Sequence, residues 1–282
     1  MVLLASGTAA RGKAFIECHD GASKPGDAHH FLLSCRSPII APTAPTPWRL
    51  LSSRPVAVPA FPCRSIHVSD SSPDFATLSL APELLANLDS LGYHAMTPIQ
   101  AESLPPMLAG RDVIARAKTG SGKTAAFGLA LLSRLSVADF RVQGLVLCPT
   151  RELADQVAGE IRRLARSLPN VKVLTLCGGA PLGPQLASLE HGAHIVVGTP
   201  GRVEEHLRKG SLALGALETL VLDEADRMLD MGFQAAMEAI IAATPADRQM
   251  LLFSATYAEG IRPIAERLMR EPVSVEVAEP HD

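Results

Sequence analysis

One glycine-rich segment constrains the fold of this 282-residue sequence more than any other feature. It reads Ala117-Lys118-Thr119-Gly120-Ser121-Gly122-Lys123-Thr124. An apolar run typical of a strand, Val113–Ala115, comes directly before it, and a helical pattern over Thr124–Leu135 follows. A glycine-rich turn from a strand into a helix is typical of α/β proteins, where it gathers backbone N–H groups at the carboxyl end of the strand.

The side chains of this segment indicate what the turn binds. The partial positive charge of the helix N-terminus suits an anion. Lys123 would add a full charge beside the β- and γ-phosphates of a nucleotide, and the Thr124 hydroxyl would bind Mg²⁺. Ala117 stands where the general pattern has its first glycine. An ordinary strand-to-helix turn is the alternative, but the Gly-Lys-Thr ending favours a phosphate-binding loop whose other members are Thr119, Gly120, Ser121 and Gly122.

From Phe75 onward, short apolar runs alternate with helical patterns such as Arg151–Leu168. This alternation predicts an α/β fold, with a mostly parallel sheet flanked by helices on both faces. Ligands in such folds collect at the carboxyl ends of the strands. The glycine-rich segment ends one predicted strand. The others are Leu145–Leu147, Val171–Leu176, Ile195–Val197, Leu220–Leu222 and Leu251–Phe253, with a closing segment at Glu271–Val277.

A second polar motif, Asp223-Glu224-Ala225-Asp226, ends the apolar strand Leu220–Leu222. A carboxylate placed there, near a phosphate loop, is where a Mg²⁺ partner is needed. We expect Asp223 to hold the metal through water and Glu224 to orient and deprotonate the attacking water. Asp226 fits an internal hydrogen bond better. A solvated acidic helix start is the alternative reading. With Lys123, the pattern predicts a nucleotide hydrolase with Lys123, Asp223 and Glu224 as its catalytic residues.

Charge and composition limit the partners of this chain. Residues 1–67 hold seven of the 26 Lys/Arg and three of the 29 Asp/Glu, which leaves 19 against 26, a net charge of −7, for residues 68–282. Such a domain is not a general polyanion-binding surface, so any RNA contact must use a few placed groups.

No run of 18 apolar residues occurs, which predicts a cytoplasmic protein without a membrane span. The five cysteines show no metal-ligand spacing, and we expect Cys148 and Cys177 to be buried thiols.

Residues 1–67 differ from everything after them. Seven prolines and no acidic residue fall between Pro38 and Pro62, and such a segment cannot bury enough apolar surface to offset its ordering entropy. We expect residues 1–67 to be a disordered extension and residues 68–282 to form the domain. Two alternatives stay open. In the first alternative, the extension is a transit peptide. In the second, it is not translated and the natural chain starts at Val68, which is considered because no methionine separates Met1 from Met96.

In wording and order, these motifs resemble those of the DEAD-box RNA helicases from Phe75 onward. The family's adenine-reading Q motif, expected at residues 73–101, is matched by Phe75, by Gly92-Tyr93 and by Thr97-Pro98-Ile99-Gln100, although Met96 stands where the family has proline. Its RNA-contacting loops are matched by Pro149-Thr150-Arg151, Gly178-Gly179 and Thr199-Pro200-Gly201-Arg202. Ser254-Ala255-Thr256, with Asp226, matches the element that couples nucleotide state to strand separation.

The resemblance implies a RecA-like domain that uses ATP and Mg²⁺. Phe75, Tyr93, Thr97 and Gln100 would bind ATP, and the Gln100 amide can pair with the N6 and N7 edge of adenine. Hydroxyls and backbone N–H groups of the three loops suit RNA phosphates and 2′-hydroxyls, without reading bases. Further sequence segments, such as Asp226–Phe233, resemble those of a bacterial subfamily whose members assist assembly of the large ribosomal subunit. We therefore expect ribosomal RNA as a partner and a monomeric protein.

The resemblance also implies what the 282 residues do alone. The family's second RecA-like domain supplies arginines that stabilise the transferred phosphoryl group, which is worth about 10³–10⁵ in rate. We expect this chain, with the first domain only, to bind nucleotide and bind RNA weakly, without unwinding it. An RNA- or protein-binding module with a vestigial ATP site and a DNA-directed motor with the same core are the alternatives. Intact Lys123, Thr124, Asp223 and Glu224 argue against the first, and the Gln100 motif with Asp-Glu-Ala-Asp argues against the second.

Overall fold

Seven parallel strands form the sheet of the structure, a computed structural model that describes residues 73–256 and 261–277. Their order across the sheet is β3-β4-β2-β5-β6-β1-β7. The strands are β1 (Val113–Arg116), β2 (Gly144–Leu147), β3 (Val173–Leu176), β4 (Ile195–Gly198), β5 (Thr219–Asp223), β6 (Gln249–Ser254) and β7 (Val273–Glu276). The predicted α/β fold with a parallel sheet is confirmed, whereas the predicted extension at residues 1–67 lies outside the described residues.

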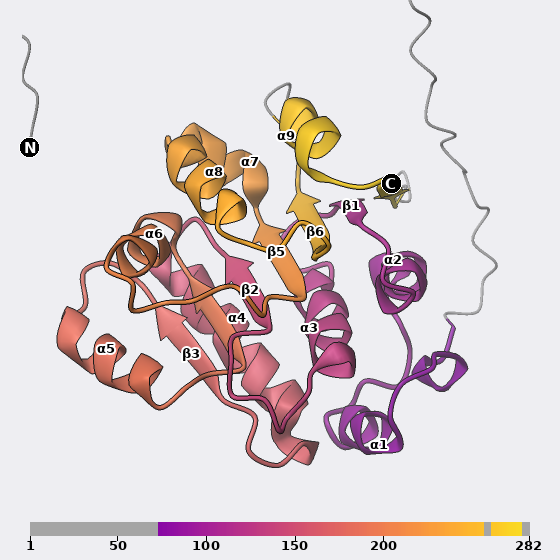
Figure 1. The fold of residues 1–282 in the computed structure, drawn as a ribbon. Helices are drawn as coiled ribbons and strands as arrows, with labels where there is room; N and C mark the ends of the chain where they lie inside the picture. The colour runs from indigo at the N-terminus through magenta and orange to yellow at the C-terminus, as the bar shows by residue number, and fades with distance from the viewer. Residues whose placement is uncertain (1–72, 257–260, 278–282) are drawn as a thin grey trace, which may run out of the picture. The chain divides into compact units, whose positions relative to one another are not determined.

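Helices cover both faces of the sheet, as Figure 1 shows. They are α1 (Pro82–Ser90), α2 (Pro98–Leu108), α3 (Lys123–Arg134), α4 (Arg151–Leu164), α5 (Leu182–Glu190), α6 (Pro200–Arg208), α7 (Ala225–Asp230), α8 (Gln234–Ala242) and α9 (Ile261–Leu268). Short 3₁₀ turns lie at Phe75–Thr77 and Ala165–Ser167. Each parallel strand is followed by a crossover before the next, which is the connection that a parallel sheet requires.

Alternate residues of each strand enter opposite cores. Val113 and Ala115 of β1 pack into the cluster formed by α1, α2, α3 and α4, while Ile114 packs into the cluster with α6, α7, α8 and α9. This alternation is the two-residue period of a strand. Both sides of the central strands are buried, which explains why they read as continuous apolar runs in the sequence.

Several element boundaries differ from the sequence prediction by one or two residues or more, among them the start of β3 and the end of α4. The predicted strand Val171–Leu176 begins only at Val173, because the backbone N–H of Lys172 donates to Nδ1 of His194 at 3.0 Å instead of to a strand. The predicted helix Arg151–Leu168 ends as an α-helix at Leu164 and continues as a 3₁₀ turn. The Asn87 amide of α1 donates to the carbonyls of Arg163 and Leu164 and so satisfies two groups at that helix end.

Parallel strands bring all their carboxyl ends to one edge, and the strand order divides that edge into two halves. Loops after β1, β5 and β6 lie on one half, and loops after β2, β3 and β4 lie on the other. The first half carries the predicted nucleotide motifs, and the second carries the predicted RNA-contacting loops.

Cys148 and Cys177 are buried free thiols, as predicted. Within the described parts of the chain, no helix is both long and apolar enough to cross a bilayer.

Candidate nucleotide and RNA site

The glycine-rich segment forms the turn from β1 into α3, and its two inner glycines adopt left-handed backbone angles. Gly120 has a φ of 86° and Gly122 a φ of 93°, values that only glycine adopts without strain. Gly122 is also the N-cap of α3. A Cβ at Gly122 would lie 2.6 Å from Nε2 of Gln100 and 3.0 Å from Oγ1 of Thr97, so this glycine also permits a close approach of α2.

Lys123 forms a buried ion pair with the carboxylates at the end of β5. Its Nζ lies 2.7 Å from Oδ1 of Asp223 and 3.6 Å from Oε1 of Glu224. The side chains of Lys123 and Asp223 are 5% and 0% exposed. The predicted catalytic residues are therefore brought together by β1 and β5, which are separated in the sheet by β6 alone. The Asp223 carboxylate thus fixes the position of the Lys123 ammonium at the carboxyl edge of the sheet.

Asp223 has the properties expected of a metal-binding carboxylate without its metal. Its two oxygens are buried and make no hydrogen bond of regular geometry with the described residues, and Oδ1 forms the ion pair with the Lys123 ammonium. Burial raises the pKa of Asp223, and the charge of Lys123 opposes this rise. A buried carboxylate oxygen without a partner is costly, and a hydrated Mg²⁺ would supply the missing interactions. The residues present thus fit Mg²⁺.

Glu224 has an unusual backbone conformation. Its φ of 55° and ψ of 53° are left-handed, which costs a non-glycine residue about 1–2 kcal/mol. Its carboxylate accepts a hydrogen bond from the Thr119 hydroxyl at 3.0 Å and one from the Arg227 guanidinium at 3.3 Å. Strain of this kind persists where surrounding contacts fix it, often at functional sites. The contacts of Glu224 hold its carboxylate over the phosphate loop.

Asp226 accepts internal hydrogen bonds, as the sequence predicted. Its Oδ2 accepts from the backbone N–H of Thr256 at 3.0 Å and from the Thr256 hydroxyl at 2.8 Å. Burial alone would raise the pKa of Asp226, but the hydrogen bonds from Thr256 and Ser254 outweigh it and lower that pKa. The Ser254 hydroxyl also donates to the carbonyl of Thr256 at 2.6 Å. The segment after β5 is thereby tied to the segment after β6.

The predicted ATP-binding residues of the Q motif separate into two groups. Thr97 and Gln100 lie against the phosphate loop: the Thr97 hydroxyl donates to the carbonyl of Ser121 at 2.9 Å, and Nε2 of Gln100 donates to the carbonyl of Gly122 at 3.0 Å. Oε1 of Gln100 accepts from the backbone N–H of Thr97, which completes a capping box at the start of α2. In this conformation Gln100 braces the loop, and its pairing with adenine stays a prediction.

Phe75 and Tyr93 form the second group and pack toward α4. Their rings meet edge to face with centroids 6.2 Å apart, and Phe75 is 2% exposed. The Tyr93 hydroxyl donates to the Glu160 carboxylate at 2.6 Å and accepts from the Arg163 guanidinium at 2.9 Å. Burial and then the Glu160 carboxylate raise the pKa of Tyr93. The structure gives both aromatic residues a packing role, and neither lines the cavity beside the phosphate loop.

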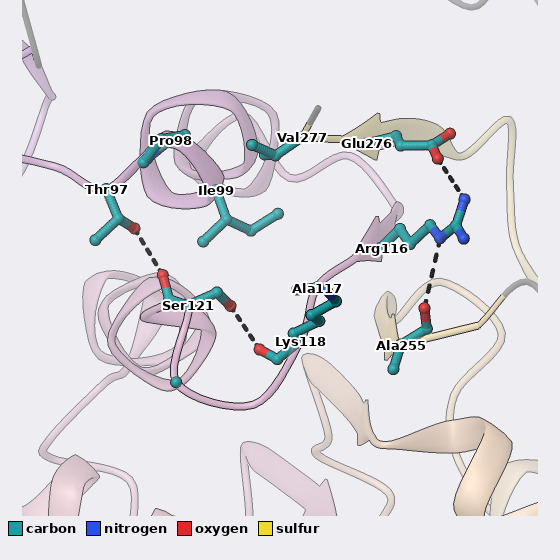
Figure 2. Close-up of a pocket in the computed structure, with 11 residues that line it drawn as sticks. Thr97, Pro98, Ile99, Arg116, Ala117, Lys118, Ser121, Ala255, Glu276 and Val277 are labelled. Carbon is teal, nitrogen blue, oxygen red and sulfur yellow. Dashed lines mark hydrogen bonds and ion pairs between the residues drawn. The ribbon is translucent and has the colours of Figure 1, made fainter. Parts of the chain in front are cut away.

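A cavity of about 640 Å³ opens beside the phosphate loop, with contributions from β1, α2, β7 and the segment after β6 (Figure 2). Two of its charged residues, Arg116 and Glu276, belong to none of the predicted motifs. They form an ion pair, and Nε of Arg116 donates to the carbonyl of Ala255 at 3.4 Å. No motif marked them. Its other lining residues are Thr97, Pro98, Ile99, Ala117, Lys118, Gly120, Ser121, Ala255 and Val277.

Three predicted RNA-contacting loops lie together on the other half of the edge. Pro149-Thr150-Arg151 follows β2, Gly178-Gly179 follows β3, and Thr199-Pro200-Gly201-Arg202 follows β4, which runs between the other two strands. Thr150 and Thr199 are the N-caps of α4 and α6, so two helix N-termini open toward this half. Helix N-termini favour phosphate groups.

The two arginines of these loops differ. Arg151 is exposed, and its guanidinium lies so close to Gly179 that a Cβ at this glycine would clash with it. The side chain of Arg202 is only 11% exposed. It donates from Nη1 and Nη2 to the carbonyl of Ala180, each at 3.1 Å, and pairs with Glu205 at 3.1 Å. An RNA contact of Arg202 stays a prediction, because its guanidinium is engaged within the protein.

Comparison with known proteins agrees with these motifs. The family model described as DEAD/DEAH box helicase matches residues 97–264. The chain is 61% identical over 204 residues to the ATP-dependent RNA helicase DbpA of Escherichia coli, covering 72% of this chain and 45% of that protein. It is 46% identical over 203 residues to the DEAD-box ATP-dependent RNA helicase CshA of Geobacillus kaustophilus, covering 72% and 43%. The chain therefore spans less than half the length of these curated relatives.

The fold agrees as well. The crystal structure of a DEAD box protein from the hyperthermophile Methanococcus jannaschii matches with a TM-score of 0.69 and 38% identity, covering 72% of this chain and 55% of that one. The match with the family model covers more than half of this chain and includes the phosphate loop and Asp223-Glu224-Ala225-Asp226. The chain belongs to the DEAD/DEAH box helicase family.

Proposed function

We propose that this chain is the ATP-binding, first RecA-like domain of an ATP-dependent RNA helicase that resembles DbpA and CshA. The observation that carries the proposal is the buried Lys123–Asp223 pair, with one oxygen of Asp223 left without a partner. Such a group is expensive to bury without a ligand. A nucleotide phosphate would replace the Asp223 carboxylate as the partner of the Lys123 ammonium. Mg²⁺ would then be the partner of the Asp223 carboxylate.

In this proposal the residues divide the work as follows. Backbone N–H groups from Thr119 to Gly122 and the Lys123 ammonium hold the phosphates, while the Thr124 hydroxyl and Asp223 hold Mg²⁺. When bound by these two residues, Mg²⁺ would supply positive charge beside the phosphates. Glu224, oriented by the Thr119 hydroxyl, accepts the proton of the attacking water. The described residues hold no cluster of three metal-binding side chains, which fits a cation that arrives with the nucleotide.

Adenine selection rests on Gln100. A carboxamide can donate two hydrogen bonds and accept two, so Gln100 keeps one of each beyond its contacts with Thr97 and Gly122. The side chain is only 1% exposed, so pairing with the base requires the start of α2 to open. We propose that the base enters the cavity beside Thr97 and Pro98, and that Phe75 and Tyr93 support this segment from behind.

RNA binding rests on the three loops after β2, β3 and β4. The residues from 68 onward carry a net charge of −7, so contacts must come from Arg151, the glycine backbone and two helix N-termini. We propose weak, sequence-independent binding to single-stranded RNA. Each phosphate neutralised on a single strand changes the logarithm of the affinity by about −0.7 per logarithm of salt concentration, so a shallow salt dependence is expected. Four further proposals rest on the resemblance to the bacterial helicase subfamily alone. They are ribosomal RNA as the target, a role in large-subunit assembly, a monomeric state and a cytoplasmic location.

Hydrolysis and unwinding are proposed for the whole protein, with a second RecA-like domain supplying arginines to the phosphates. The decisive experiment is a titration with fluorescent ADP, with Mg²⁺ or with EDTA. We expect binding that needs Mg²⁺ and is lost in Lys123→Ala, whose folding is checked by circular dichroism. Lys209→Ala, which removes the exposed lysine at the C-cap of α6, is the matched control. Equal affinity in Lys123→Ala and the unmodified chain would contradict the proposal and favour a vestigial ATP site.

A further inference from the structure

A buried glutamine of α5, Gln185, connects the elements that carry two of the RNA-contacting loops. It is 8% exposed. Its Nε2 donates to the carbonyl of Cys177 at 3.1 Å, and its Oε1 accepts from Nη1 of Arg202 at 2.9 Å and lies 3.0 Å from Nε2 of His206. Three of the four hydrogen-bonding positions of the amide are thus used. α5 packs against β3, at the edge of the sheet where these loops begin (Figure 1).

The partners of Gln185 surround Gly178-Gly179. Cys177 precedes the pair, and its carbonyl is held directly by Gln185. Ala180 follows the pair, and its carbonyl is held by Arg202, which Gln185 itself orients. Gly179 has a φ of 75°, so the turn can flex at a residue without side-chain restraint. The orientation of the peptide groups between Cys177 and Ala180 is therefore set by one amide and one guanidinium.

His206 of α6 fixes the amide from the other side. The ring is fully buried, and Nε2 faces the Gln185 carbonyl oxygen, so Nε2 carries the proton. Nδ1 lies 2.8 Å from the Ser211 hydroxyl oxygen, and this hydroxyl also donates to the carbonyl of His206 at 3.1 Å. Burial, and after it the charge of Arg202, lower the pKa of His206, while Glu205 acts against them. Neutral His206 thus keeps Oε1 of Gln185 pointing at Arg202.

We propose that Gln185 is a positioning residue for RNA: it holds Arg202 and the Gly178-Gly179 turn in the arrangement that binds the RNA backbone. This inference rests on the proposed RNA contact of these loops. A core amide that serves folding alone is the simpler explanation. The location of its partners argues against it. Cys177 and Arg202 lie next to or in two predicted RNA-contacting loops, and His206 lies one helical turn after Arg202 in α6. None of the three lies in the nucleotide half of the edge.

The test compares Gln185→Met with Gln234→Met, which removes an exposed glutamine of α8. The 282-residue chain is titrated with a fluorescein-labelled single-stranded RNA and, separately, with fluorescent ADP and Mg²⁺. Loss of the hydrogen bond to Arg202 is expected to weaken RNA binding about tenfold, with ADP affinity changed less than about twofold. Gln185→Glu, which keeps the acceptor for Arg202 and His206, should recover part of the RNA affinity. The Gln234 variant should match the unmodified chain.

A second measurement keeps the test independent of RNA affinity. Amide hydrogen exchange at residues 178–180 should be faster in Gln185→Met, and exchange at residues 118–122 should be unchanged. Failure of the unmodified chain to bind RNA would refute the proposed RNA contact, and with it the purpose assigned to Gln185. With RNA bound by the unmodified chain, unchanged affinity and exchange in Gln185→Met would overturn the positioning role. A parallel loss of RNA and ADP affinity would overturn it as well, because it would reveal a general effect on folding.

Discussion

Replacing Lys123 with methionine should destabilise the fold itself, apart from any effect on nucleotide binding. The change keeps the length of the side chain and removes its charge. Lys123 is 4% exposed and Asp223 is 0% exposed, so the carboxylate of Asp223 would lose the counter-charge that lies 2.7 Å away. Breaking a buried pair by removing one partner costs about 3–5 kcal/mol. With a urea slope of about 3 kcal/mol/M for a domain of this size, the unfolding midpoint should fall by about 1–2 M.

The assay is urea unfolding without nucleotide, followed by circular dichroism. Lys209→Met is the matched control, because Lys209 pairs with Glu205 at 2.9 Å on the surface, where ion pairs contribute little. The double variant Lys123→Met/Asp223→Asn should recover more than half of the lost stability, since it removes the unpaired charge. A midpoint for Lys123→Met equal to that of the unmodified chain would refute the reasoning, as would a double variant no more stable than Lys123→Met.

The pH dependence gives an independent check of the same pair. Burial already raises the pKa of Asp223, and Lys123 opposes this rise, so the pKa rises further in Lys123→Met. A carboxyl whose pKa is raised by folding contributes stability below its unfolded pKa and loses it as pH increases through the folded pKa. The destabilisation by Lys123→Met should therefore shrink between pH 8 and pH 5. A penalty independent of pH would show that packing, not charge, causes it.

Three further predictions concern other parts of the edge. Gly122→Ala should lower the free energy of unfolding by about 1–3 kcal/mol more than Gly120→Ala does. Both glycines have a positive φ, but only a Cβ at Gly122 would meet the Gln100 side chain, at 2.6 Å. Equal losses of stability in urea unfolding would contradict this prediction. The pKa of His206 is lowered from 6.5 by burial and then by Arg202, with Lys209 adding and Glu205 opposing, so its contribution to stability should be lost as pH falls below 6.5. His206→Gln should flatten the unfolding profile between pH 5 and 7. Asp226→Asn should cost about 1–3 kcal/mol, because it replaces one of the two carboxylate oxygens, which accept from Thr256 and from the backbone N–H of Arg227, by an NH2 group that cannot accept. Exposed Asp230→Asn should leave the urea midpoint unchanged.

The parts of the fold that depend on local pattern could be predicted from the sequence. Apolar runs gave the strands, because a parallel sheet buried on both faces needs continuous apolar residues. The meeting of Lys123 with Asp223 followed from two motifs placed at strand ends, and the structure confirms their contact at 2.7 Å. The internal hydrogen bond of Asp226 was also predicted, and Thr256 proved to be the donor.

The rest depends on contacts between distant segments. The motif that predicts ATP binding by Tyr93 contains no sign that the Tyr93 hydroxyl donates to Glu160, 67 residues away. Nothing in the local pattern distinguishes Gln185 from any other helical glutamine, because its partners come from three separate elements. Arg116 and Glu276 meet because β1 and β7 pair in register, which no short window of sequence contains. Boundaries failed for the same reason: a ring nitrogen of His194 takes the N–H of Lys172.

The two halves of the edge meet at the loop after β5, because β5 pairs with β6 on one side and β2 on the other. This loop contacts the phosphate turn through Glu224 and the segment after β6 through Asp226. On the other half, a Cβ on Gly201 would lie 4.0 Å from the ring of Phe233, just beyond α7. Coupling along such a path needs one link with two arrangements. Glu224 fits that link, because its left-handed backbone is strained and its carboxylate accepts from the hydroxyl of Thr119, a residue of the phosphate loop that is proposed to bind the nucleotide.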